Sequence, residues 1–423
     1  MSLIEQITFW SKCYINPCIR RDRYISSIKS LTIAWRAYGL KAKEESVIMR
    51  IIHFSDTHLG FADFGKTDPE LGINLREADV YRAFSQVIEY IRKNPPDIVL
   101  HSGDLFETSR PSNRAINFVL KEIAKISQMG IPFILISGNH STPRTRGSGS
   151  IFEAFEIFDG LYPVYQSKYE RIGIKNVLFH CIPHMPTEED MNTAFEMLSP
   201  DPKSKYNVIV SHAGVTAAIH YKMGEFNELM IPFSALTKKN DFDYIAMGHY
   251  HGHLALAPNA YYSGSTERFS FREANDQKGF MDVDLNNKKF KFIPIEVREM
   301  KTFEPIDCLG LSVKEIEDAV ERLTKTRIND KIVQITFDKM SRHQYVELDL
   351  HRLKEITSDA VYVKWTPIWV VEKGKEVIQT SIGTLTTEFE SYLESQEIND
   401  LDITKLKKMG SGYLSVADEP EGT

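Results

Sequence analysis

The sequence predicts an α/β protein in which helices cover β-sheets, followed by a smaller α/β unit. Between residues 49 and about 300, short apolar runs alternate with amphipathic stretches, which is the pattern of strands and their covering helices. A second region, from about residue 301 to 378, shows the same alternation on a smaller scale. The six apolar runs of the first region are Ile51–Phe54, Ile98–Leu100, Phe133–Ile136, Val177–Phe179, Val208–Val210 and Tyr244–Met247.

Two helices are predicted between the first three runs. Each carries apolar residues three and four apart, which is the spacing of one helix face. The second helix is expected to begin after Ser112, whose hydroxyl suits an N-cap, and to end before Gly130. The stripes are Val80, Phe84, Val87, Ile88 and Ile91 in the first helix, and Ile116, Val119, Leu120 and Ile123 in the second.

The smaller region combines a helix with two strand-like runs. Ile316, Val320 and Leu323 form the apolar face of the predicted helix, and Ile332–Phe337 and Val361–Trp365 are the runs. After it comes an amphipathic stretch that needs an apolar groove to bury its stripe. That stripe consists of Leu385, Phe389, Tyr392 and Leu393.

These patterns predict four segments. Residues 1–48 form an N-terminal extension without a predicted fold, which we interpret as a disordered arm or an over-extended start before Met49; a basic DNA-contacting or targeting arm is the alternative. Residues 49–300 form the large domain and residues 301–378 the small one. Residues 379–423 form a C-terminal helical segment with an acidic tail.

The composition is typical of a soluble globular protein with room for two or three domains. Of 423 residues, 42% are apolar and 26% charged, and no apolar run approaches the ~18 residues of a membrane span. The cysteines Cys13, Cys18, Cys181 and Cys308 match neither a disulfide framework nor a paired zinc motif, which favours a reducing, cytoplasmic setting. The net charge of -7 argues against holding DNA by bulk electrostatics, so contacts with nucleic acid are expected to be local or shared with a partner.

Polar clusters rich in Asp, Asn and His follow five of the six apolar runs. Ligands of α/β sheets bind beyond the carboxyl ends of the strands, so these clusters are expected to converge on one crevice. Residues two apart on an extended chain point to the same side, which lets one cluster deliver two ligands. The clusters contain Asp56 with His58, Asp104, Asn139 with His140, His212, and His249 with His251.

This mixture of side chains predicts a site for two metal ions. Imidazole, carboxylate and amide ligands together suit manganese, iron or zinc better than calcium or magnesium. A carboxylate such as Asp104 can bridge two cations, and two-metal sites stabilise the attacking and leaving oxygens of an in-line displacement. A single buried histidine is more often a satisfied core residue, but five clusters at five strand ends favour the metal site.

The order of the clusters resembles the calcineurin-like metallophosphoesterase superfamily, whose pattern runs D-x-H, G-D, G-N-H, H and G-H-x-H. The flanking segments 53–60, 103–106, 109–112 and 262–271 look like the SbcD and Mre-eleven type nucleases, which process DNA double-strand breaks. The resemblance covers residues 49 to about 285 well and the later segments only by arrangement. It implies a β-sandwich flanked by helices, a smaller α/β capping domain and a C-terminal helical segment.

The resemblance also implies roles for the clustered residues and two manganese ions per chain, with Mg²⁺, Fe²⁺ or Zn²⁺ as substitutes. His140 would stabilise the charge that develops at the phosphate and the leaving oxygen. The expected activities are exonuclease action on duplex ends and endonuclease action on single strands. One ion would be held by Asp56, His58 and His251 and the other by Asn139, His212 and His249, with Asp104 as the bridge.

Three residues near the motifs need separate interpretation. Glu107 stands where archaeal relatives usually carry His and bacterial SbcD proteins often an acid, which puts the balance of the two nuclease activities in question. Ser141 stands where the superfamily usually places an acid that would orient its neighbours. We interpret His253 as structural or as part of the substrate's surroundings rather than as a ligand.

The resemblance implies three partners: DNA, an SbcC-type coiled-coil ATPase and a second copy of the chain. The stripe from Leu385 to Leu393 would dock on the ATPase or pack within the chain. The stripes of the two early helices would form the dimer or face their own sheet. Two other functions stay open: a phosphoesterase acting on nucleotides or other phosphodiesters, because a metal site alone does not choose a substrate, and a non-catalytic scaffold.

Overall fold

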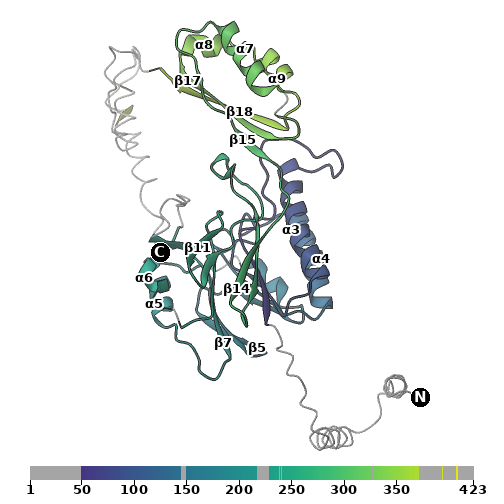
Figure 1. Cartoon of the computed structure of the whole chain (residues 1–423), viewed down its shortest axis with the longest axis vertical. Helices are drawn as coiled ribbons and strands as arrows, with labels where there is room; N and C mark the ends of the chain where they lie inside the picture. Colours follow the sequence, from purple (N-terminus) through teal and green to yellow (C-terminus); the bar gives the residue numbers. More distant parts are fainter. Residues whose placement is uncertain are drawn as a thin grey trace, which may run out of the picture. The chain divides into compact units, whose positions relative to one another are not determined.

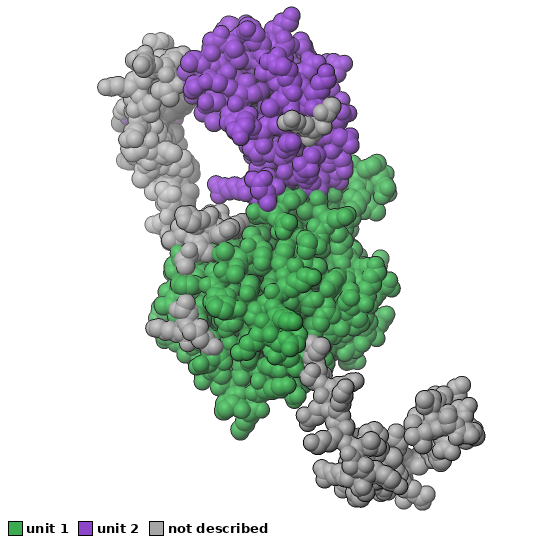
Figure 2. Space-filling model, viewed as in Figure 1, with its two compact units in different colours: residues 1–268, 276–297 green, residues 269–275, 298–423 purple. Residues whose placement is uncertain are grey.

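The computed structural model describes residues 49–143, 149–216, 228–237, 239, 241–325, 328–370, 393 and 406–407. They divide into two compact units, drawn in different colours in Figure 2. Unit 1 comprises the chain up to residue 268 together with 276–297, and unit 2 comprises 269–275 and the chain from residue 298. The predicted extension 1–48 lies outside the described residues.

Two six-stranded sheets form unit 1 (Figure 1). The first has the order β14-β13-β1-β2-β3-β4, and the second has the order β11-β12-β10-β7-β6-β5. The first sheet consists of β1 (Arg50–Phe54), β2 (Ile98–His101), β3 (Phe133–Ile136), β4 (Leu161–Val164), β13 (Gly279–Asp284) and β14 (Lys289–Pro294). The second consists of β5 (Glu170–Ile174), β6 (Val177–Ile182), β7 (Tyr206–His212), β10 (Tyr244–Gly248), β11 (Leu254–Ala257) and β12 (Ala260–Tyr262).

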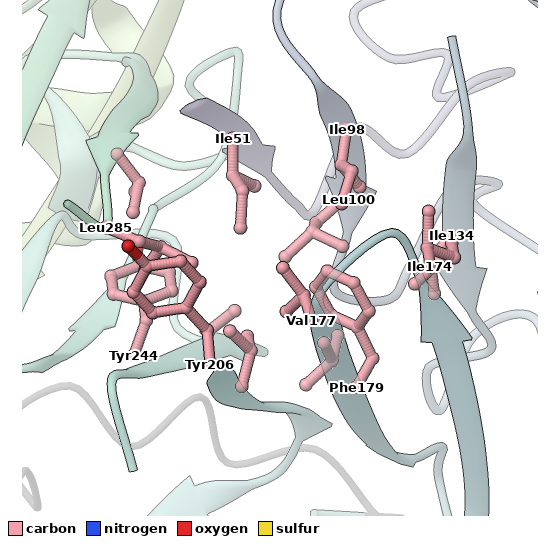
Figure 3. Close-up of a cluster of buried hydrophobic side chains, with 14 of the residues drawn as sticks. Ile51, Ile98, Leu100, Ile134, Ile174, Val177, Phe179, Tyr206, Tyr244 and Leu285 are labelled. Atoms are coloured by element: carbon pink, nitrogen blue, oxygen red, sulfur yellow. The ribbon is translucent and has the colours of Figure 1, made fainter. Parts of the chain in front are cut away.

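The main core of unit 1 lies between these two sheets. Its side chains come from alternate positions of the strands, as the two-residue period of a strand requires. Ile51 and Leu100 of the first sheet and Phe179 and Tyr244 of the second belong to this cluster (Figure 3). All six predicted apolar runs lie within strands, namely β1, β2, β3, β6, β7 and β10. The prediction of a mixed α/β fold built on a sandwich of sheets is therefore confirmed.

Helices cover the outer faces of the sandwich. Helix α3 (Leu75–Lys93) buries its whole predicted stripe, and Phe84 meets Phe54 of β1 edge-on, with ring centroids 5.9 Å apart. Helix α4 (Asn113–Gln128) begins at Ser112, whose Oγ accepts a hydrogen bond from Ala115 N at 3.2 Å, so the predicted N-cap is confirmed. The shorter helices are η2 (Ile151–Phe155), α5 (Glu188–Glu196) and α6 (Phe233–Thr237), and two short strands, β8 (Gly214–Val215) and β9 (Met230–Ile231), pair with each other.

Unit 2 is a small α/β unit built on a parallel sheet. Strand β17 pairs in parallel with each of the other three strands. Ile316 and Val320 of helix α7 pack in one cluster with Val333, Ile335 and Phe337 of β17. Its elements are η4 (Phe271–Glu273), β15 (Met300–Thr302), β16 (Ile306–Asp307), α7 (Val313–Thr324), β17 (Ile332–Met340), α8 (Arg342–Glu347), α9 (Leu350–Ile356) and β18 (Tyr362–Trp369). Among the described residues of both units, none of the helices combines the length and the hydropathy needed to cross a membrane.

The inter-sheet core makes a prediction about stability. Replacing the fully buried Phe179 by Ala should lower the free energy of unfolding by about 3 to 5 kcal/mol, because the truncation leaves a cavity between two close-packed sheets. Ile157→Ala, at a side chain that is 78% exposed, is the control and should have almost no effect. Urea unfolding measures both; equal losses would contradict the assignment of the core.

A buried histidine makes a prediction about pH. His53 is fully buried between Tyr244 Oη (2.9 Å) and Ser102 Oγ (2.8 Å), and burial lowers its pKa to about 3. In the unfolded chain a histidine has a pKa near ~6.5, so between these values the unfolded state binds the extra proton and stability falls as pH falls. Between pH 6 and 4 the free energy of unfolding should fall less steeply in His53→Gln than in the native chain, by up to about 1.4 kcal/mol per pH unit. An unchanged slope in urea unfolding would show that His53 is not held neutral.

Candidate metal centre

The ends of five parallel strands carry the clustered residues. In the first sheet β1, β2 and β3 are parallel neighbours, and in the second β7 and β10 are. Their carboxyl ends therefore open toward one edge of the sandwich, as expected for ligands of α/β sheets. Asp56 and His58 follow β1, Asp104 follows β2, Asn139 and His140 follow β3, His212 ends β7, and His249 and His251 follow β10.

Asp104 brings the two sheets together at this edge. Its Oδ2 lies 3.0 Å from Nε2 of His212, and its Oδ1 accepts a hydrogen bond from His140 N at 2.9 Å. Oδ1 of Asn139 lies 2.9 Å from the same Nε2 of His212. Ligand atoms of Asp56, Asp104 and His212 all lie within 4.8 Å of one another. One part of the predicted site is thus assembled from three strands of the first sheet and one of the second.

A second group shares Asp56. Ligand atoms of Asp56, His58 and His251 also lie within 4.8 Å of one another, and Nε2 of His58 faces Nε2 of His251 at 3.1 Å. The backbone N–H of His249 donates to Asp56 Oδ1 at 3.0 Å, which ties the loop after β10 to the loop after β1. This group matches the trio expected to hold the first ion.

The electrostatics of the site favour a positive charge among these acceptors. Burial acts to raise the pKa of the Asp104 carboxyl, but the imidazoles of His212, His140 and His58 outweigh it and hold this pKa well below its ordinary value. Burial acts to lower the pKa of His212, but Asp104 outweighs it and raises this pKa to about 9. Nδ1 of His212 donates to the carbonyl of Ser102 at 2.9 Å, so its Nε2 is the atom that faces Asp104 and Asn139. Because a bare Nε2, a carboxylate and an amide oxygen all offer lone pairs, either a proton or a cation must lie among them, and the donor set fits a divalent cation.

The backbone at the site is held in a conformation that L-residues rarely adopt. Positive φ angles occur at Asp56 (51°), His58 (43°), Asp104 (52°) and His249 (109°), all residues predicted as ligands. Each such residue costs on the order of 1 to 3 kcal/mol and persists only where the surrounding structure enforces it. Strain of this kind concentrates at functional sites.

Two glycines of the motifs make room for the ligands. A Cβ on Gly103, where φ is 108°, would run into the ring of His212. A Cβ on Gly138 would run into the carboxylate of Asp104. Neither position can carry a larger residue without displacing a predicted ligand.

His140 lies next to His58, and ligand atoms of His58, Glu107 and His140 all lie within 4.8 Å of one another. Its Nδ1 donates to the backbone carbonyl of Glu107 at 2.8 Å, and its ring meets that of His58 edge-on with centroids 4.7 Å apart. Glu107 places Oε2 2.9 Å from Nδ1 of His58. Ser141 is fully buried, and its hydroxyl has no hydrogen-bond partner in the described part of the chain. His140 is therefore oriented by Asp104 and Glu107 rather than by the residue at position 141.

His253 lies away from the clustered ligands. Its Nδ1 donates to the carbonyl of Tyr262 at 3.0 Å, and its ring stacks on Phe292 with centroids 4.3 Å apart. Burial lowers its pKa, which keeps the ring neutral. These contacts suit a structural residue.

Two residues that support the ligands have no motif of their own. The side chain of Glu228, only 2% exposed, places Oε1 3.4 Å from Nε2 of His249. The buried Lys278 donates from Nζ to the carbonyl of His251 and to Ser265 Oγ, both at 2.9 Å. An isolated Glu or Lys in a sequence gives no sign of such a contact, so sequence reasoning missed both.

The predicted partner-binding stripe is almost entirely outside the described part of the chain. This holds for Leu385, Phe389 and Tyr392, while Leu393 is described and buried. The docking role of this segment stays a prediction.

The sandwich fold and the clustered side chains are those expected of a metal-dependent phosphoesterase. Residues 49–253, just under half of the chain, match the calcineurin-like phosphoesterase family. The predicted resemblance to this family is confirmed.

Several relatives carry the name DNA double-strand break repair protein Mre11. The chain is 31% identical to that of Saccharolobus solfataricus over 205 residues, or 48% of this chain and 50% of the relative. It is 29% identical to that of Thermoplasma acidophilum over 292 residues, 66% and 73% of the two chains, and 28% identical to that of Methanocaldococcus jannaschii over 329 residues, 74% and 83%. The similarity thus spans half of the first relative and most of the other two.

The converging acceptors make a prediction about metal binding. Added Mn²⁺ should raise the thermal unfolding temperature by several degrees, because binding to the folded state alone at 100 times the Kd contributes about 2.7 kcal/mol. Asp104→Asn should abolish most of this shift by removing a buried negative charge among the predicted ligands, on the residue expected to bridge the two ions. Glu70→Gln, at a side chain that is 82% exposed, is the control and should keep the full shift. An Asp104→Asn protein that responds like the control would refute the predicted site.

Proposed function

We propose that the chain is a manganese-dependent DNA nuclease of the SbcD type that acts in double-strand-break repair. It would cut duplex ends as an exonuclease and single strands as an endonuclease. The observation that carries the proposal is the meeting of Asp104 with His212 and Asn139 at the edge of the sandwich, next to Asp56 with His58 and His251. The similarity to relatives named as double-strand break repair proteins supports DNA as the substrate.

The ligands would divide into two sets around a shared carboxylate. In this arrangement two bound cations would supply positive charge for the phosphate oxygens and would make water more acidic. The chain holds the ligand atoms in place beforehand, through the hydrogen bonds from His249 N to Asp56 and from His140 N to Asp104. The first set would be Asp56, His58 and His251, the second would be Asn139, His212 and His249, and Asp104 would belong to both.

His140 would act on the leaving group. A carbonyl oxygen can only accept, so the contact with Glu107 O places a proton on Nδ1 and leaves Nε2 as the nitrogen that exchanges a proton. An imidazole near neutral pH can donate that proton to the departing oxygen. Replacement of His140 should therefore slow cutting without removing the cations.

Unit 2 would serve as the capping domain that helps admit DNA, as the resemblance implies. The segment 379–423 would dock on an SbcC-type ATPase by laying its apolar stripe into a groove of that partner. Both proposals rest on the resemblance and on the position of these segments along the chain. The setting would be the cytoplasm, near the nucleoid.

A homodimer would use the outer surface of α3 and α4. The predicted stripe of α3 faces its own sheet, but a groove of about 1220 Å³ on the other side is lined by Tyr81, Tyr90, Phe118 and Ile295. Charged residues of both signs border it, including Arg114 and Lys121 with Glu89 and Glu296. A two-fold interface pairs one patch with itself, so charges of both signs on that patch let opposite charges of the two copies face each other.

The proposal is tested with end-labelled linear duplex DNA, single-stranded DNA and a generic phosphodiester such as bis(p-nitrophenyl) phosphate. Each is incubated with the full chain and Mn²⁺, or with chelator. We expect both DNA substrates to be cut with Mn²⁺ and neither with chelator. Turnover of the generic ester alone would favour a phosphoesterase acting on nucleotides or other small phosphodiesters. A chain that binds no Mn²⁺ would favour the non-catalytic scaffold.

His140→Asn should lower the rate of DNA cutting by about 10²- to 10⁴-fold, the usual contribution of a positioned acid or base. Mn²⁺ binding should stay near that of the native chain, because the proposed ligands remain. The matched control is His253→Asn. It replaces a histidine that contacts Tyr262 and Phe292 away from the clustered residues, and this variant should cut DNA at nearly the native rate. Native cutting by His140→Asn would withdraw the role given to this residue.

A further inference from the structure

Glu107 contacts two histidines of the site through two different groups. Its carboxylate Oε2 lies 2.9 Å from Nδ1 of His58, and its backbone carbonyl accepts from Nδ1 of His140 at 2.8 Å. The three side chains offer ligand atoms within 4.8 Å of one another. Glu107 therefore contacts both His58, a proposed ligand of the first set, and His140, which we propose acts on the leaving group.

The main chain of Glu107 is anchored to the strand end that carries His58. Its N–H donates to the carbonyl of Leu59 at 3.2 Å, and Leu59 N donates to the carbonyl of Leu105 at 2.9 Å. The loops after β1 and β2 thus run side by side in this short stretch, where Leu59 forms a bridge with Phe106. Glu107 is held next to His58 by backbone contacts that do not depend on its side chain.

The contact with His58 decides which of its nitrogens faces the site. A neutral imidazole carries one N–H, and His58 Nε2 is the atom that faces His251 Nε2 at 3.1 Å. A carboxylate next to Nδ1 keeps the proton there, which leaves Nε2 with a bare lone pair for a cation. The side chain of His58 is almost fully buried, so solvent has little access to replace this partner.

We propose that Glu107 is a positioning residue that sets the tautomer of both histidines, through its carboxylate for His58 and through its carbonyl for His140. The proposal rests on the proposed function, in which His58 holds a cation. It assigns the two effects to separable groups: a change of the side chain affects His58 and leaves His140 as it was. The acid at this position then keeps Nε2 of His58 free of a proton for the first set of ligands.

The alternative is that Glu107 is itself a ligand. Oε2 of Glu107 lies 2.9 Å from Nδ1 of His58, which is a close electrostatic contact without the alignment of a hydrogen bond. If Nδ1 of His58 bound a further cation together with Glu107, His58 would have to use both of its nitrogens for cations. A positioning role needs only one proton on the ring, and we therefore favour it.

The test measures Mn²⁺ binding by calorimetry on the full chain, with Glu107→Ala, Glu107→Gln and Glu107→Asp beside the native protein. We expect two ions in every variant and a 10- to 100-fold weaker affinity at one of them in Glu107→Ala, the usual effect of removing a partner behind a ligand. Glu107→Asp should recover part of the loss and Glu107→Gln less. The control is Glu70→Ala, whose side chain is 82% exposed and which should bind both ions as the native chain does.

A second measurement reads the tautomers directly. In ¹⁵N-histidine NMR spectra of the metal-free protein, His58 should carry its proton on Nδ1 in the native chain and become a mixture in Glu107→Ala. His140 should keep its proton on Nδ1 in both, because the carbonyl of Glu107 remains. A merely structural loss would disturb the two rings alike, and thermal unfolding shows whether the variants fold.

The outcomes separate the proposals. Equal affinities and an unchanged His58 tautomer in Glu107→Ala would overturn the role of Glu107. The role of Glu107 would also be overturned if the native chain bound three ions and Glu107→Ala bound two, because Glu107 would then be a ligand itself. A native chain that binds no Mn²⁺ would refute the proposed function, while the NMR comparison would still decide whether Glu107 sets the two tautomers.

Discussion

One buried carboxylate, Asp104, joins the two sheets of unit 1 at the edge where the site lies. It accepts from His140 N after β3 of the first sheet and lies 3.0 Å from His212 Nε2 at the end of β7 in the second. A buried carboxylate without partners would cost several kcal/mol, so the chain around it is strongly constrained. Gly138 lacks a side chain because Asp104 occupies that space. Asp56 and His212 place their own ligand atoms within 4.8 Å of this group.

The convergence of the clustered residues on one edge could be predicted from the sequence, because each cluster follows an apolar run that had to be a buried strand. The division of those strands between two sheets could not be predicted from periodicity, since β1 and β7 both read as fully buried runs. A sandwich of two sheets was expected only from the resemblance. The small unit was predictable for the same reason as the large one, from a helical stripe next to strand-like runs.

The surroundings of the ligands were beyond sequence reasoning. Glu228 and Lys278 approach His249 and His251 through folding of distant segments, and neither belongs to a spaced motif. The left-handed backbone at Asp56 and Asp104 was likewise invisible, because aspartate adopts this conformation more often than most residues but in only a minority of its positions. The missing acid at Ser141 did not reveal what holds His140, whose Nδ1 donates to the backbone carbonyl of Glu107 at 2.8 Å.

The chain leaves unit 1 after Arg268 and returns at Asp276, where the Arg268 guanidinium donates to the carbonyl of Asp276 at 2.8 Å. The seven residues between them belong to unit 2, in which Phe271 lies under the ammonium group of Lys364. Strands β13 and β14 of unit 1 come later in the chain than this excursion. No single cut of the polypeptide can therefore separate the two units. A fragment ending at residue 297 would contain all strands of the sandwich, but it would also contain residues 269–275 of unit 2, and Phe271 would lose its contact with Lys364.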